Sequence, residues 1–156
     1  MKKSMLIIGA IVPVVVGYAV NRLLMVPFIG GLSFIILPLP TTAFWAYLGC
    51  QCARSSRKLL PSSLDGNSVG ILSLLVYIWQ FLFQTDKSRN IFLAAVSQMF
   101  SAAVPTYLLG RIAMLFESEP NFVGRRAMLA LQVLSLVYMM AIFACGYLWG
   151  KRKQKL

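Results

Sequence analysis

Uncharged hydrogen-bonding side chains recur at helical spacing inside the apolar stretches of this sequence. Three stretches carry such sets: Ser73, Tyr77, Gln80 and Gln84 in the first, Gln98 and Ser101 in the second, and Gln132 and Ser135 in the third. Spacings of three and four residues place the members of each set on one face of a helix. Amide and hydroxyl groups without formal charge suit an uncharged or zwitterionic ligand.

Two threonines follow two prolines in an earlier stretch, 26–54, which is long and apolar enough to cross a membrane. Pro38 and Pro40 each remove a backbone donor and disfavour helix at the preceding residue. In lipid, such a break is tolerated where protein or trapped water satisfies the freed groups. We therefore predict a broken helix here, with Thr41 and Thr42 beside the break.

Depth estimates connect these residues. At about 1.5 Å per residue, Gln80 and Gln98 both lie roughly 8–11 Å from the turn at Asp86, so they can meet across it. We predict one polar band inside a bundle, in which the threonines face the polar groups of the later helices. Its members are Thr41, Thr42, Tyr77, Gln80, Gln98, Ser101, Gln132 and Ser135. Thr106 lies near the level of Gln132.

Two interpretations of this band remain open. Glutamine, serine and threonine can join helices, each interhelical hydrogen bond contributing about 0.6 kcal/mol. Alternatively, the band is a solute-binding cavity at the point where a helix is broken. The spacing does not separate the two, because both produce polar stripes.

The composition is that of an integral membrane protein. The chain has 156 residues, of which 59% are hydrophobic and 12% are charged, and its mean hydropathy is +0.77. Soluble domains carry about 25% charged residues. The chain has room for about five or six spans of about 20 residues and no separate soluble domain.

We therefore predict an all-α, polytopic membrane helix bundle, a single domain over residues 1–156. Its five helices are expected over residues 5–24, 26–53, 68–84, 91–116 and 122–150, with a loop at 54–67. A sixth span results if the second helix is a pair of half-spans. Asn67 or Ser68 is the expected cap of the third helix, and Ser88 or Asn90 that of the fourth. The N-terminus has the outline of a signal peptide, but its long apolar run favours a retained helix.

Enzymatic chemistry is not favoured. The chain has no histidine, its four carboxylates (Asp65, Asp86, Glu117 and Glu119) are all expected in loops, and no phosphate-binding loop is present. Glu117 and Glu119 are expected beside Arg125 and Arg126, as a charged turn. The three cysteines are expected to act as small hydrophobic residues. We expect no catalytic residue, metal site or cofactor, and the absence of a buried acid disfavours proton coupling.

The net charge of +11 arises from residues that flank apolar segments, as expected for contact with anionic lipid headgroups. This flanking pattern argues against nucleic-acid binding. Five crossings divide the basic residues eight to seven between the two sides, and a chain that turns back at the prolines gives eight to seven again. The positive-inside rule therefore leaves the orientation open.

The function favoured by the sequence is that of a multi-pass cell-membrane protein that binds or translocates a small uncharged or zwitterionic solute. It would act as a transporter or as the substrate-capture subunit of one. The alternative is a non-catalytic accessory or assembly subunit of a larger membrane complex, which would bind a partner membrane protein. Gly9 and Gly17 are small residues that would permit close helix approach in either case.

Overall fold

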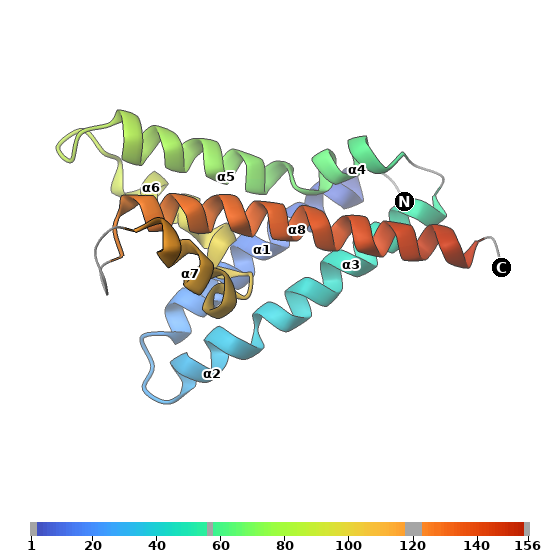
Figure 1. The fold of residues 1–156 in the computed structure, drawn as a ribbon, viewed down its shortest axis with the longest axis horizontal. Coiled ribbons are helices and arrows are strands. Elements are labelled where there is room, and N and C mark those ends of the chain that lie inside the picture. Colours follow the sequence, from blue (N-terminus) through green and yellow to red (C-terminus); the bar gives the residue numbers. More distant parts are fainter. Residues whose placement is uncertain (1–2, 56–57, 118–122, 155–156) are drawn as a thin grey trace.

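The computed structural model describes residues 3–55, 58–117 and 123–154, which are helical without any strand. The elements are α1 (Lys3–Leu23), α2 (Ile29–Ile36), α3 (Pro38–Arg54), α4 (Leu59–Gly66), α5 (Ser68–Ile78), the π-helical turn η1 (Trp79–Phe83), α6 (Ile91–Ala102), α7 (Thr106–Ala113), the 3₁₀ turn η2 (Met114–Phe116) and α8 (Arg125–Lys153) (Figure 1). The all-helical fold is confirmed. Among these residues, three helices are long and apolar enough to cross a membrane, or up to five if each of two bent pairs is one span.

Helix α8 runs along the length of the molecule, and α3 packs against it (Figure 1). Glycines bring the two backbones together: Gly146 lies against the Ala46 carbonyl, and Gly150 against that of Cys50. Residue numbers increase in the same direction along both helices from the first contact to the second, so α3 and α8 run parallel. Small residues permit this approach, because a Cβ atom would fill the space that the facing backbone occupies.

The core lies where α3 and α8 meet the bend between α6 and α7. Trp45, Phe143 and Val104 are fully buried, and Phe100 is almost so. The Trp45 indole Nε1 donates to Asn67 Oδ1 at 3.0 Å, which satisfies the one polar atom of this large buried side chain.

Large apolar side chains also cover much of the outer surface. Phe28, Leu32 and Ile35 on and before α2 are exposed, as are Leu72 on α5 and Leu148 on α8. An apolar surface of this extent marks contact with lipid or with other proteins.

The alternative in which the chain divides into two half-spans at Pro38 and Pro40 is wrong. Leu37 keeps right-handed helical angles (φ −62°, ψ −32°), and its N–H donates to the Ser33 carbonyl at 3.0 Å. Residues 29–54 form one candidate span. The prolines occupy the first and third positions of α3, where a missing N–H leaves few hydrogen bonds unmade.

The sharp break lies instead in the predicted helix 91–116, where α6 and α7 meet at 109°. Pro105 has φ −65° and ψ 70°, outside the helical region. Its ring removes a donor and disfavours helix at Val104. The prediction of one continuous fourth helix is therefore wrong.

The predicted loop 54–67 is also wrong in part, because it contains α4, with Pro61 in the first turn. Helices α4 and α5 meet at 56°. Asn90 caps α6 as predicted, its Oδ1 accepting from the Leu93 N–H at 3.1 Å. Asn67 does not cap α5; its amide Nδ2 donates to the Ser63 carbonyl at 2.9 Å instead.

Candidate functional site

A cavity of about 370 Å³ lies among α1, α2, α6, α7 and α8. It sits at the bend between α6 and α7, so the Pro105 break gives it one wall. Its hydrogen-bonding lining residues are Asn21, Gln98, Ser101 and Thr106; the others are Leu24, Phe34, Ala102, Gly110, Ala113, Met114, Val123, Ala127, Met128 and Leu131. None of these carries a formal charge.

Two of the predicted site residues, Gln98 and Ser101, line this cavity, and a third, Gln132, bonds to Ser101. Gln132 of α8 donates from Nε2 to Ser101 Oγ of α6 at 2.9 Å, and both side chains are buried. Ser101 donates in turn to the Gln98 carbonyl at 2.8 Å. The Gln98 side chain donates to the Ala94 carbonyl at 3.2 Å. The Gln132–Ser101 bond joins α8 to α6, and the other two bonds lie within α6.

Thr106 begins α7 directly after the bend, and only 8% of its surface is exposed. Its backbone N–H donates to the Val104 carbonyl at 2.6 Å. Its hydroxyl Oγ1 is buried and has no hydrogen-bond partner among the residues that the structure describes. Thr106 is the first residue of α7, so no preceding helical turn offers the carbonyl to which a threonine hydroxyl can bond, and its donor and acceptor stay unused beside the cavity.

Asn21 of α1 adds an amide to the same cavity. Its Nδ2 lies 3.1 Å from the Met99 sulfur, which is a weak acceptor. The ligand set predicted from the sequence omitted Asn21 and Thr106. The signal for Thr106 was its position after Pro105, which repeats the Pro40–Thr41 pattern.

Thr41 and Thr42 lie away from the cavity lining. Thr41 Oγ1 donates to the Leu37 carbonyl at 3.2 Å, and Thr42 Oγ1 donates to the Pro38 carbonyl at 2.9 Å. Thr42 also shares a hydrogen bond with Tyr138 OH of α8 at 3.1 Å. These hydroxyls therefore bond within α3 and to α8, and none of their hydrogen bonds reaches Gln98, Ser101 or Gln132. Ser135 likewise bonds within its own helix, to the Leu131 carbonyl at 2.6 Å.

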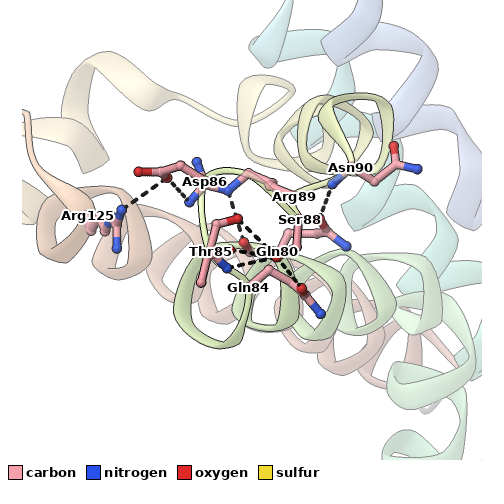
Figure 2. Close-up of polar contacts among 8 residues, drawn as sticks. All are labelled: Gln80, Gln84, Thr85, Asp86, Ser88, Arg89, Asn90 and Arg125. Atoms are coloured by element: carbon pink, nitrogen blue, oxygen red, sulfur yellow. Dashed lines mark hydrogen bonds and ion pairs between the residues drawn. The ribbon is translucent and has the colours of Figure 1, made fainter.

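Gln80 and Tyr77 belong to a second cluster, around the turn between α5 and α6. Gln80 Oε1 accepts from the Asn90 N–H at 2.9 Å, and its carbonyl accepts from Arg89 Nε at 3.0 Å (Figure 2). The Arg89 guanidinium lies over the Phe81 ring, 4.6 Å from its centre, and Phe81 stacks on Tyr77 at 4.5 Å. The predicted contact of Gln80 with Gln98 is therefore replaced by bonds that close the turn.

Asp86 joins this turn to the start of α8. Its Oδ1 lies 2.8 Å from Arg89 Nη2 and 3.4 Å from Arg125 Nη2 (Figure 2). Thr85 and Ser88 bond to each other within the turn, with their hydroxyls 2.9 Å apart. The cluster is internally paired, and these bonds hold the turn against α8.

Glu117 forms a cap for α8. Its Oε2 accepts from the Gly124 N–H at 2.9 Å and from the Ala127 N–H at 3.4 Å. A carboxylate at this position satisfies donors that a helix start leaves unpaired and complements the helix dipole. Glu119, which was predicted beside it, lies outside the described residues. Asp65 lies in α4 and not in a loop as expected.

The described residues contain no group of three or more His, Cys, Asp or Glu side chains placed to hold a metal ion. The chemistry that the cavity offers is therefore hydrogen bonding from neutral groups within an apolar wall. A comparison of the chain with protein-family models, with curated proteins and with solved structures finds no match.

Proposed function

We propose that the protein is a multi-pass membrane protein that binds a small uncharged, largely apolar molecule in the cavity at the α6–α7 bend. The observation that carries this proposal is the Thr106 hydroxyl, which is buried beside the cavity without a hydrogen-bond partner in the described part of the chain. Leaving a buried hydroxyl unbonded costs about 1–3 kcal/mol. A ligand that bonds to Thr106 would offset this cost.

The lining indicates the class of ligand. Asn21, Gln98, Ser101 and Thr106 present neutral polar groups, and the remaining described lining residues are apolar. A charged ligand would lose its hydration without gaining a counter-ion. An alcohol, ketone or amide with an apolar body would contact both the polar and the apolar lining residues. The cavity volume lies at the lower end of the usual range of ligand pockets.

Binding at a helix break suits a transporter or the substrate-capture subunit of one, because unwound backbone at membrane depth commonly borders a ligand cavity. An accessory subunit with a purely structural bundle would not need the Thr106 hydroxyl. The two hypotheses therefore differ in the expected effect of removing this one group.

The experiment uses a photoactivatable octanol, an eight-carbon alcohol that carries a diazirine, with the purified protein in lipid nanodiscs. We expect labelled peptides from α7 and the first turns of α8, with competition by unmodified octanol. Thr106→Val replaces the hydroxyl by a methyl group of similar size. Because a net hydrogen bond contributes about 0.5–1.5 kcal/mol, this variant should lower the apparent affinity about 2–10-fold.

Thr42→Val is the matched control, because its hydroxyl bonds to Pro38 and Tyr138 outside the cavity lining. It should leave the labelling unchanged. Equal labelling of the wild type and Thr106→Val, or labelling of the outer surface without competition, would contradict the proposal and favour the accessory-subunit hypothesis.

A further inference from the structure

We infer that α6, α7 and η2 form a re-entrant unit, which enters the membrane and leaves it on the same side, so that the chain crosses four times. The termini then share the cytoplasmic side. The cavity is reached from the opposite side, a consequence that rests on the proposed function.

The α8 residues that contact this unit show how deep each part of it lies along the bundle. Asp86, just before α6, pairs with Arg125, the first residue of α8. Ser101, near the end of α6, bonds to Gln132. At about 1.5 Å per residue, Gln132 lies roughly 10 Å further along α8 than Arg125. Helix α6 therefore runs from the level of the first residue of α8 towards the middle of the bundle.

After the bend, the chain returns to the level of the first turn of α8. Glu117, directly after η2, accepts hydrogen bonds from the N–H groups of Gly124 and Ala127, at the first turn of α8. A full crossing would instead leave Glu117 near the far end of α8, whose 29 residues extend over about 43 Å. The 109° angle between α6 and α7 produces the return.

The lengths agree with a re-entrant unit. Helix α6 has 12 residues and so extends about 18 Å, short of the roughly 30 Å hydrocarbon core. Non-helical backbone at membrane depth must be covered by protein. Ala103 and Val104, at the bend, are fully buried.

Four crossings remain, namely α1, α2 with α3, α4 with α5 and η1, and α8. They place the start of α1, the end of α3 and the end of α8 at one end of the bundle, where the N- and C-terminal marks lie in Figure 1. The turn between α5 and α6 and the start of α8 lie at the other end.

This arrangement separates the charges that a five-crossing chain distributes almost evenly. The sequence segments that flank the end with the termini hold nine basic residues: Lys2, Lys3, Arg54, Arg57, Lys58, Lys151, Arg152, Lys153 and Lys155. The sequence segments that flank the other end hold the remaining six, Arg22, Lys87, Arg89, Arg111, Arg125 and Arg126, and three of the four acidic residues, Asp86, Glu117 and Glu119. The positive-inside rule then assigns the termini to the cytoplasm, beside anionic lipid headgroups.

The cavity lies in the half of the bundle away from the termini. Asn21 and Leu24 line it at the end of α1, and Ala127 and Met128 line it at the first turn of α8. A ligand would therefore arrive from the extracytoplasmic side or its leaflet.

Cysteine accessibility tests the inference. In a background of Cys50→Ser, Cys52→Ala and Cys145→Ser, single cysteines are introduced as Lys87→Cys and Val123→Cys, and as Lys58→Cys and Gln154→Cys. All four positions are exposed. Intact cells are treated with a membrane-impermeant maleimide, and labelling after denaturation gives the total.

We expect the first pair to react in intact cells and the second pair only after permeabilisation. Reaction of Lys87→Cys and Val123→Cys from opposite sides would overturn the re-entrant unit. Reaction of Gln154→Cys in intact cells would overturn the assigned orientation. The labelling is carried out without added ligand, so failure of this inference and failure of the proposed function are separate outcomes.

Discussion

Replacing Gly146 by alanine tests whether the close approach of α3 and α8 holds the bundle together. A Cβ atom at this position would overlap the Ala46 carbonyl, which is backbone and cannot rotate aside. The two helices must separate locally to admit it. Overpacking of this kind costs about 1–3 kcal/mol, whereas alanine itself favours helix over glycine by about 0.5–1 kcal/mol.

The net expectation for Gly146→Ala is a loss of about 1–2 kcal/mol in the free energy of unfolding. Gly31→Ala makes the same chemical change on α2, where an added Cβ meets no atom within 4 Å. There the helix propensity acts alone, so stability should rise by about 0.5–1 kcal/mol. The two variants should thus shift stability in opposite directions.

Unfolding by SDS titration from mild detergent micelles, followed by circular dichroism at 222 nm, measures both changes. Retained helicity at zero SDS shows that each variant folds before the titration begins. If Gly146→Ala proved as stable as Gly31→Ala, the parallel contact of α3 with α8 at Ala46 would be refuted.

Substitutions of Trp45 and Glu117 probe two polar contacts within the bundle. Trp45→Phe removes the donor to Asn67 Oδ1 and leaves that oxygen buried, so it should lower stability by about 1–3 kcal/mol in the same SDS titration. Trp149→Phe, at a side chain 62% exposed, should change stability little. Glu117→Ala should cost about 0.5–2 kcal/mol through loss of the α8 cap, and Glu117→Gln should cost less because it keeps an acceptor. Equal stability of all three residues at position 117 would show that the cap contributes nothing.

The helical class and the apolar character of the segments were predictable from local information. Long apolar runs bounded by basic residues have few stable alternatives to helix in a membrane, because every backbone group must be bonded within its segment. The polar network of Gln132 with Ser101 follows in part from the same spacing, since helical periodicity placed each residue on an inward face.

The positions of the breaks were not predictable in the same way. Pro38, Pro40 and Pro105 all lack an N–H, yet the chain bends by 109° only at the last. Leu37 remains helical between α2 and α3, whereas Val104 is fully buried at a bend. A proline inside a helix costs about 3 kcal/mol or more, and the packing of neighbouring helices decides at which proline the chain bends.

In the candidate site, too, some features follow from residue type and others from the tertiary structure. Residue type alone determined that polar groups in these helices would be neutral, since the apolar stretches hold amides and hydroxyls and scarcely any charge. Only the tertiary structure decided which of them meet: Gln98, Ser101 and Thr106 line one cavity at the bend, Gln132 bonds to Ser101, Thr42 bonds to Tyr138, and Gln80 closes a turn. Helical periodicity sets the face on which a residue lies, but the angle between two helices sets what that face meets.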